Sequence, residues 1–246
     1  MYRNHDEILT DSGKGKVGKD VSTPIAFFPT FRINIQYQFD NTYSDIWEYK
    51  AAFSTINFQN YIGDKCLICG AEGCFTPIRE YYRYAIELFP YRKDKVPVAR
   101  FVCRNTGQTF SLLPRQLIPY CQYTVDAVVG TLLKAYQFQQ SGQAGYYGAS
   151  LELDPDCSVT PYLIQTWAVL LLYGFLRGHH VFYTKFPMPH MPDPRKAVAA
   201  VYLYLQSIGN TDCPNRTSVI PAIRYYFHQT RKCLFGKTSC DRNRSP

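Results

Sequence analysis

The chain of 246 residues contains no apolar segment long enough to cross a lipid bilayer. Its longest apolar run, Trp167 to Leu176, is too short for a span and is interrupted by Gly174. The first residues, Met1 to Glu7, lead into no hydrophobic stretch of the kind that a secretory signal peptide carries. We therefore expect a cytoplasmic protein with no membrane partner.

Signatures of catalysis are also missing. The segment Gly13 to Lys16 contains glycine and lysine but lacks the spacing of a phosphate-binding loop. No serine or cysteine nucleophile motif occurs. Glu152, Asp154 and Asp156 lie close together, but a ribonuclease-like transposase needs acidic residues that converge on two metal ions from a mixed sheet. We therefore expect no catalytic centre in this chain.

Long blocks of like charge are absent, and 46% of the residues are hydrophobic, so most of the chain should fold. The formal net charge is +8. Residues 1–60 carry 6 basic and 7 acidic side chains, residues 61–125 carry 9 and 5, and residues 126–246 carry 12 and 7. This excess of positive charge favours a polyanionic partner, because phosphate neutralisation releases counterions.

The N-terminal quarter divides into two parts. Residues 1–24 are polar and predict a flexible tail. In residues 25–60 we expect an aromatic strand followed by a helix that leads into the ribbon-like subdomain. Aromatic and branched side chains alternate with polar ones from Phe31 to Phe39, a period typical of a half-buried strand. The helix is expected between Ser44 and Phe58.

Residues 61–122 predict a small β subdomain. Two strands are expected, at Tyr81–Leu88 and Val96–Val102, with a basic turn from Pro90 to Lys95 between them. Pro114 and Pro119 are expected to stop any regular element, because proline lacks an amide donor and restricts the residue before it.

Residues 123–236 predict a helical domain, and residues 237–246 a basic tail. Thr124 precedes apolar residues at helical spacing, and Thr160 with Pro161 has the pattern of a helix start. We expect a polar loop at 137–148, a short helix at 149–153, and the end of the second long helix at Gly178. Two further helices are expected at 195–208 and 218–232. The fold class is thus α+β, a β subdomain followed by a mainly helical bundle.

The cysteines form the strongest local motif. Cys66 and Cys69, followed by Gly70, have the spacing of a knuckle that presents two thiolates to one tetrahedral ion. Cys103 lies where a third ligand belongs, but Thr106 occupies the position of the expected fourth cysteine.

Four alternatives stay open for these cysteines. Cys74 or Cys121 completes a four-thiolate zinc site, or the site has three ligands and an open position. Alternatively, the ribbon has lost its metal and is held by packing alone. A redox role of Cys66 and Cys69 is the fourth alternative, although no βαβ pattern surrounds them.

These motifs resemble a known domain family. After the first knuckle follow the strand Tyr81-Tyr82-Arg83, then Thr109 to Pro114, then Leu117 to Tyr120. The pattern resembles a family of unknown function that joins a zinc ribbon to a helix-turn-helix, and it is similar to the N-terminal part of insertion-sequence transposases. The resemblance covers about Pro24 to Gly236. It implies a DNA-binding protein from the surroundings of prokaryotic mobile elements.

A helix-turn-helix would direct the second long helix toward DNA. On that interpretation one face of the helix reads bases, whereas basic residues elsewhere contact phosphates. The expected DNA-contacting residues are Arg104, Arg115, Lys134, Tyr162, Gln165, Thr166 and Arg177.

The leading hypothesis is therefore a non-catalytic DNA-binding accessory protein of a mobile element, with double-stranded DNA as its partner. The alternative is a protein-interaction module that docks onto a transposase or a similar protein without contacting DNA.

Overall fold

The fold is α+β, with a four-stranded sheet and seven α-helices among the residues described here. The computed structural model describes residues 35–39, 41–188, 193, 195–208, 219–230 and 232–235, all of which belong to one compact unit. The expected tails at 1–24 and 237–246, and the start of the expected aromatic strand, lie outside the described residues. No helix in the described part of the chain is long and apolar enough to cross a membrane.

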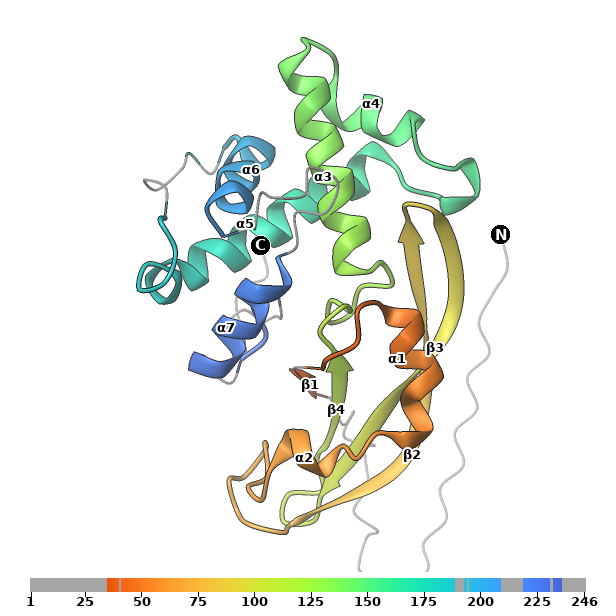
Figure 1. The fold of residues 1–246 in the computed structure, drawn as a ribbon, viewed down its shortest axis with the longest axis vertical. Coiled ribbons are helices and arrows are strands. Elements are labelled where there is room, and N and C mark those ends of the chain that lie inside the picture. Colours follow the sequence, from red (N-terminus) through yellow and green to blue (C-terminus); the bar gives the residue numbers. More distant parts are fainter. Residues whose placement is uncertain are drawn as a thin grey trace, which may run out of the picture. The chain divides into compact units, whose positions relative to one another are not determined.

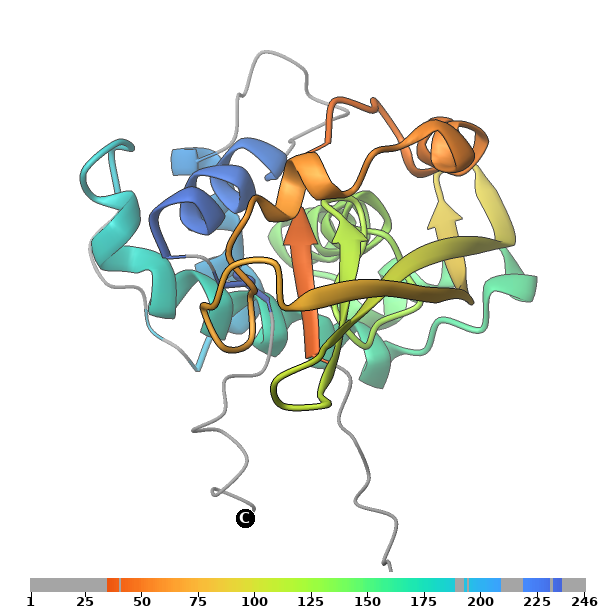
Figure 2. The ribbon, with the colours of Figure 1, turned by 90° about the horizontal axis from the view of Figure 1, so that it is seen from below.

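The sheet has the strand order β1-β4-β3-β2 (Figures 1 and 2). Strands β2 (Phe75–Leu88) and β3 (Tyr91–Cys103) form a long antiparallel hairpin, and β3 pairs with β4 (Thr109–Pro114) in the same manner. Strand β1 (Ile35–Phe39) lies parallel to β4. Because β2 is the last strand in this order, the hairpin forms one edge of the sheet.

The hairpin differs from the sequence prediction at its tip. The expected turn from Pro90 to Lys95 is wrong, because only Phe89 and Pro90 connect the strands. Their peptide bond is cis. The basic residues after them continue β3, with Tyr91 opposite Leu88 and Lys95 opposite Tyr84. The two-residue connection lets pairing begin at once, so these residues gain the alternating faces of a strand.

Two residues of the neighbouring strands β1 and β4 refine the sequence prediction. Pro114 ends a regular element as expected, since it is the last residue of β4, opposite Phe39 of β1. A proline is tolerated there because the ladder ends at this residue. Gln38 is a polar residue of the alternating pattern, yet it is only 1% exposed. Its amide donates to the carbonyl of Leu117 (2.7 Å), which satisfies a polar group inside the protein.

The segment after β1 forms short helices in place of one longer helix. Helix α1 (Ile46–Ala52) begins at Asp45, whose carboxylate accepts from the amides of Trp47 and Glu48. A 3₁₀ turn and the short helix α2 (Gln59–Ile62) follow, so the expected helix at 44–58 is broken after Ala52. Helix α1 lies along the hairpin (Figure 1) and buries Ile46 and Tyr49.

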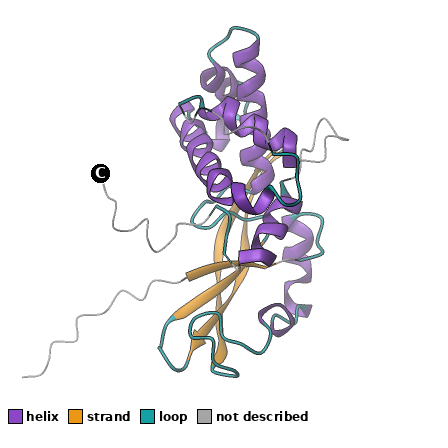
Figure 3. Cartoon of the chain, turned by 90° about the vertical axis from the view of Figure 1, so that its left-hand side faces the viewer, coloured by secondary structure: helices purple, strands orange, loops and turns teal. Residues whose placement is uncertain are grey.

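Both threonine-capped helices form where the sequence predicts them. Helix α3 (Val125–Gln140) begins at Thr124, and helix α5 (Pro161–Phe182) begins at Thr160; each hydroxyl accepts an amide hydrogen bond three residues on. Helices α6 (Ala197–Ile208) and α7 (Ile220–Thr230) match the expected ranges within two residues at each end. Figure 3 shows most of the helices gathered around one end of the sheet.

Three helix boundaries differ from the prediction. Helix α3 continues to Gln140, and α4 (Gly145–Leu151) begins inside the expected loop. Helix α5 does not end at Gly178 but continues to Phe182. A Cβ at Gly178 would lie 2.6 Å from the Phe182 ring and 3.0 Å from the Leu234 side chain. This glycine therefore serves close packing inside a helix and is not a helix terminator.

Two hydrophobic clusters make up the core. One lies between the sheet, α1 and the cysteine segments, and includes Tyr49, Val98 and Phe110. The other lies among α3 to α7, and its centre includes Trp167 and Phe175. We call the region from α3 through α7 the helical half. Residues of the hairpin tip and the following loop join its cluster, so the two parts pack directly against each other.

Candidate metal centre

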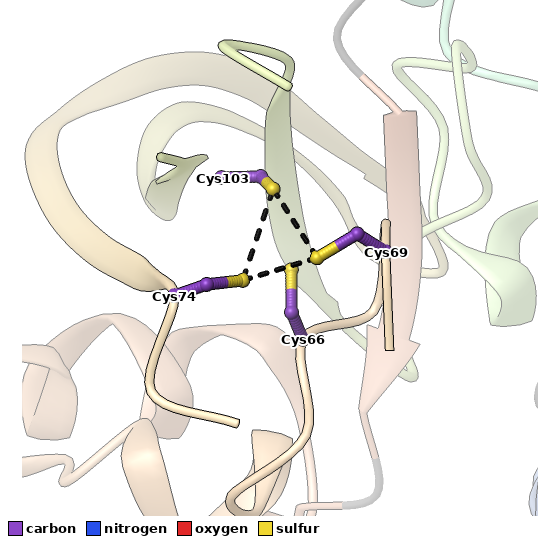
Figure 4. A group of neighbouring side chains, drawn as sticks. All are labelled: Cys66, Cys69, Cys74 and Cys103. Carbon is purple, nitrogen blue, oxygen red and sulfur yellow. Dashed lines mark hydrogen bonds between the residues drawn. The ribbon is translucent and has the colours of Figure 1, made fainter. Parts of the chain in front are cut away.

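Four cysteine side chains converge at the end of the β2–β3 hairpin that lies away from its tip (Figure 4). Cys66 and Cys69 lie in the turn after α2, Cys74 directly precedes β2, and Cys103 is the last residue of β3. Their sulfur atoms all lie within 4.8 Å of one another. We call this group the cysteine cluster.

The first knuckle owes its shape to backbone hydrogen bonds. The amide of Gly70 donates to the carbonyl of Cys66 (2.9 Å), and the amide of Cys66 donates to the carbonyl of Ala71 (2.9 Å). Gly70 has φ of 75°, a left-handed conformation that favours glycine. The amide of Ile68 also donates to the Cys66 sulfur (3.4 Å). The turn thereby directs both of its sulfur atoms to one point.

A second turn carries Cys103. The amide of Gly107 donates to the carbonyl of Cys103 (2.7 Å), and Gly107 has φ of 67°. Thr106 occupies the position where the fourth ligand was expected, but its hydroxyl donates a hydrogen bond to the Cys103 sulfur. This hydrogen bond is the main cause that lowers the pKa of Cys103 to about 6. Thr106 thus supports a thiolate and does not act as a ligand itself.

Cys74 supplies the fourth sulfur because of strand register. Phe75 pairs with Cys103 across the hairpin, and the amide of Arg104 donates to the carbonyl of Cys74 (2.7 Å). The start of β2 therefore brings Cys74 beside Cys103. Sequence reasoning named Cys74 as one of two options, and the structure brings it to the cluster, whereas Cys121 lies outside it.

Two of the sulfur separations match those around one tetrahedral ion, and the separation between Cys69 and Cys74 is shorter. The Cys69 sulfur lies 3.1 Å from that of Cys74 and 3.6 Å from that of Cys103, and those of Cys74 and Cys103 are 3.8 Å apart. A tetrahedral ion with metal–sulfur bonds of about 2.3 Å places its sulfur atoms about 3.8 Å apart. Four thiolates leave no open coordination position, so such a site is structural in character.

The cluster is buried on three sides and open on one. Cys66, Cys74 and Cys103 are buried, whereas Cys69 is exposed. The side-chain amide of Asn105 donates to the Cys69 sulfur (3.6 Å). Burial and neighbouring thiols raise the pKa of Cys74 above its ordinary value, which an ion at this position would reverse. The open side at Cys69 offers an entry path for an ion.

The basic residues expected to contact DNA have partners within the protein. Arg115 and Arg177 donate to the carbonyls of Tyr43 (3.2 Å) and Leu234 (2.6 Å) and are partly buried. Both therefore contribute to the fold, and their expected contacts with DNA stay a prediction. Lys134 pairs with Glu152, and Arg104 donates to the carbonyl of Gly73 (2.6 Å) while staying exposed.

The expected base-reading residues lie on the outer face of α5. Tyr162, Gln165 and Thr166 are exposed, whereas Trp167 is buried. The Thr166 hydroxyl donates to the carbonyl of Tyr162 within the helix (2.9 Å). The helix therefore separates an exposed outer face from the packed face, as its sequence pattern predicts.

The acidic residues near α5 have structural partners. Glu152 pairs with Lys134, and the Asp154 carboxylate accepts from the amide of Asp156 (2.9 Å) at the start of a 3₁₀ turn, Pro155–Cys157.

Sequence reasoning missed one surface of the hairpin. Tyr82 and Tyr84 are exposed on β2, and the ammonium groups of Lys93 and Lys95 lie 5.0 and 5.5 Å from the centre of the Tyr84 ring. We call these four residues the hairpin face. The alternating tyrosines Tyr82 and Tyr84 indicated an exposed face in the sequence. Lys93 and Lys95 were assigned to a turn, however, and residues of a turn do not alternate between two faces as those of a strand do.

Comparisons with known proteins give no further assignment. No protein-family model, no curated protein and no solved structure matches this chain.

Proposed function

We propose that the chain is a non-catalytic DNA-binding protein whose cysteine cluster holds a structural zinc ion in a ribbon-like turn. The observation that carries this proposal is the convergence of Cys66, Cys69, Cys74 and Cys103 on one point. It supports a complete ligand set where the sequence alone left the fourth ligand open. The proposal places the protein in the cytoplasm, where paired cysteines hold metal more often than they form disulfides.

Zinc suits this donor set better than other abundant cations. Four thiolates are soft ligands and exclude magnesium and calcium, which prefer oxygen. When bound, the ion would hold the two knuckle turns together, and the Thr106 hydroxyl would stabilise the Cys103 thiolate from outside the coordination shell.

The DNA-contacting surface of this proposal is the start of α5. Tyr162, Gln165 and Thr166 are exposed there, and amide and hydroxyl side chains bond to base edges. Phosphate contacts are assigned to Arg104, which is exposed, and to Lys134, whose pairing with Glu152 is weak enough to be exchanged for a phosphate. As the resemblance implies, the protein would serve a prokaryotic mobile element.

Metal analysis tests the zinc site. Purified protein should contain about one equivalent of zinc, and Cys103→Ser should lose it. Cys157→Ser is the matched control, because Cys157 is equally buried but lies outside the cluster. A wild-type protein without metal after expression in zinc-containing medium would refute the site.

DNA binding is tested with duplexes from the region that flanks the coding sequence, at several salt concentrations. Affinity should fall steeply with salt, and the double variant Gln165→Ala, Thr166→Ala should bind more weakly. Gln206→Ala, on the exposed side of α6, is the control. An affinity that does not change between low and moderate salt would contradict the proposal.

A second candidate function has its own support. The exposed side of α5 presents Tyr162, Val169 and Tyr173, and no charged residue occurs in this helix before Arg177. Protein interfaces are rich in tyrosine and poor in charge at their centre. On this alternative α5 docks onto a transposase or similar partner. Binding of a co-encoded protein without any shift of DNA would favour it over DNA contact.

A further inference from the structure

The β2–β3 hairpin carries an aromatic and basic surface that the proposed α5 interface does not use. Tyr82 and Tyr84 are 59% and 39% exposed, and they lie two residues apart on the edge strand of the sheet. Alternate residues of a strand share a face, so both rings project from the same side. Lys93 and Lys95 project from this side too, since both approach the Tyr84 ring.

Near the tip of the hairpin, between Tyr81 and Lys95, the negative charges are directed elsewhere. From Tyr81 to Lys95, all of which the structure describes, the acidic residues are Glu87 and Asp94. The Glu87 carboxylate accepts from the Trp47 indole, and Asp94 pairs with Lys50, so both turn toward α1. The hairpin face thus combines two cations with two exposed rings, a combination complementary to phosphates and bases.

The spacing of the rings favours a single strand over a duplex. Residues two apart on a strand are separated by about 6.7 Å. Stacked bases along one strand of duplex DNA are about 3.4 Å apart. Neighbouring bases can therefore lie on both tyrosines only if they separate from each other, which an extended single strand allows and a duplex does not.

From this arrangement we infer that the hairpin face binds single-stranded nucleic acid, with successive bases stacked on Tyr82 and Tyr84 and with phosphates contacted by Lys93 and Lys95. The inference rests on the proposed function, because it names a second nucleic-acid surface on the same protein. It adds single strands to the duplex that α5 is proposed to contact.

The test uses the full-length protein and fluorescence anisotropy with a labelled oligothymidylate and a labelled duplex of equal length. Tyr82→Ala and Tyr84→Ala should each weaken single-strand binding about tenfold, since stacking contributes about 1–3 kcal/mol per base. Duplex affinity should change by less than about twofold. Tyr82→Phe with Tyr84→Phe keeps both rings and should retain single-strand binding.

Tyr147→Ala is the matched control, because Tyr147 is also 59% exposed but lies on α4. Replacing both lysines by glutamine should lower the salt dependence of single-strand binding by about 1.4 in the slope of log K against log salt. Thermal unfolding of each variant shows whether the fold is intact. Should an alanine variant unfold, the lysine pair keeps the test decisive, because an unchanged salt slope in that variant would overturn the inference.

The outcomes separate the two proposals. A protein that binds the duplex but not oligothymidylate, or whose single-strand affinity is unchanged in both alanine variants, overturns the inference and leaves the proposed function standing. A protein that binds neither nucleic acid overturns both.

Discussion

Around the cysteine cluster the backbone is largely irregular, whereas most of the described residues in the helical half lie in regular helices with a packed interior. Residues 63–74 contain only turns and isolated bridges, and residues 104–108 form a loop. In the helical half, Trp167 and Phe175 are buried among four other helices and the residues around Leu234. Short loops with few apolar side chains need a cross-link, while amphipathic helices are stabilised by packing.

Because of this difference, the cysteine end and the helical half should respond differently to metal removal and to core substitutions. Removing the proposed zinc ion should loosen the cysteine end and leave the helices intact, and removing core volume from the helices should leave the cysteine cluster intact. Each substitution or treatment below affects either the cysteine cluster or the helical half.

Metal removal should have the largest effect. Structural zinc contributes roughly 10–16 kcal/mol of apparent binding free energy in small zinc domains. Treatment with a chelator, or Cys103→Ser, should therefore accelerate amide hydrogen exchange at residues 63–74 and 103–109. Exchange within α3 and α5 should stay slow. Uniform acceleration over the whole chain would show that the two parts are one cooperative unit.

Trp167→Ala should be the most damaging single change in the helical half. Trp167 is 2% exposed, and its ring lies 4.7 Å from that of Tyr123, so truncation leaves a large cavity. The expected loss is about 3–5 kcal/mol in the free energy of unfolding, measured with denaturant. Zinc content should not change. Tyr173→Ala, on the exposed side of α5, serves as control and should cost less than about 0.5 kcal/mol.

Gly174→Ala should have a smaller effect in the same region. The added Cβ would lie 2.6 Å from the Phe235 ring and 2.9 Å from the Leu234 carbonyl oxygen. Overpacking of this kind costs about 1–3 kcal/mol.

Gly130→Ala provides the comparison for Gly174→Ala. Its nearest neighbour is the ring of Phe89, at 2.7 Å, and Phe89 is 45% exposed and free to shift. Thermal unfolding of the two variants should therefore place Gly130→Ala clearly closer to wild type. Equal losses would mean that the Leu234 segment yields as readily as the hairpin tip.

Thr160→Ala should have the smallest effect. The hydroxyl accepts the amide of Leu163 (3.2 Å) at the start of α5, and loss of such a cap costs about 1 kcal/mol. Thr160→Ser keeps the acceptor and should restore the free energy of unfolding. A serine variant as unstable as the alanine variant would assign the effect to the methyl group.

The helix starts could be read from the sequence because capping is local. Thr124 and Thr160 each act on an amide three residues away, so no distant contact is needed to define them. The helix ends were harder to predict from the sequence. Glycine is a common helix terminator, which made Gly178 a candidate for the end of α5. Its close packing against Leu234, more than fifty residues away in the sequence, gives it a different role.

The candidate metal centre likewise has members that local sequence spacing predicts and one that it does not. Cys66, Cys69 and Cys103 were predicted, because knuckle turns have local spacing. Cys74 stayed one of two options, since its approach to Cys103 depends on the register of β2 against β3. The lysines of the hairpin face were assigned to a turn, because the sequence does not show that two residues suffice to connect the strands.

By itself the amino-acid sequence determined the α+β class, the helix starts and three members of the cysteine cluster, since each of these depends on residues within a few positions of one another. Only the tertiary structure decided that Cys74 completes the cluster, that Arg115 and Arg177 support the fold, and that Lys93 and Lys95 share a face with two tyrosines. Those outcomes depend on strand register and on contacts between residues far apart in the chain, and local spacing carries no information about either.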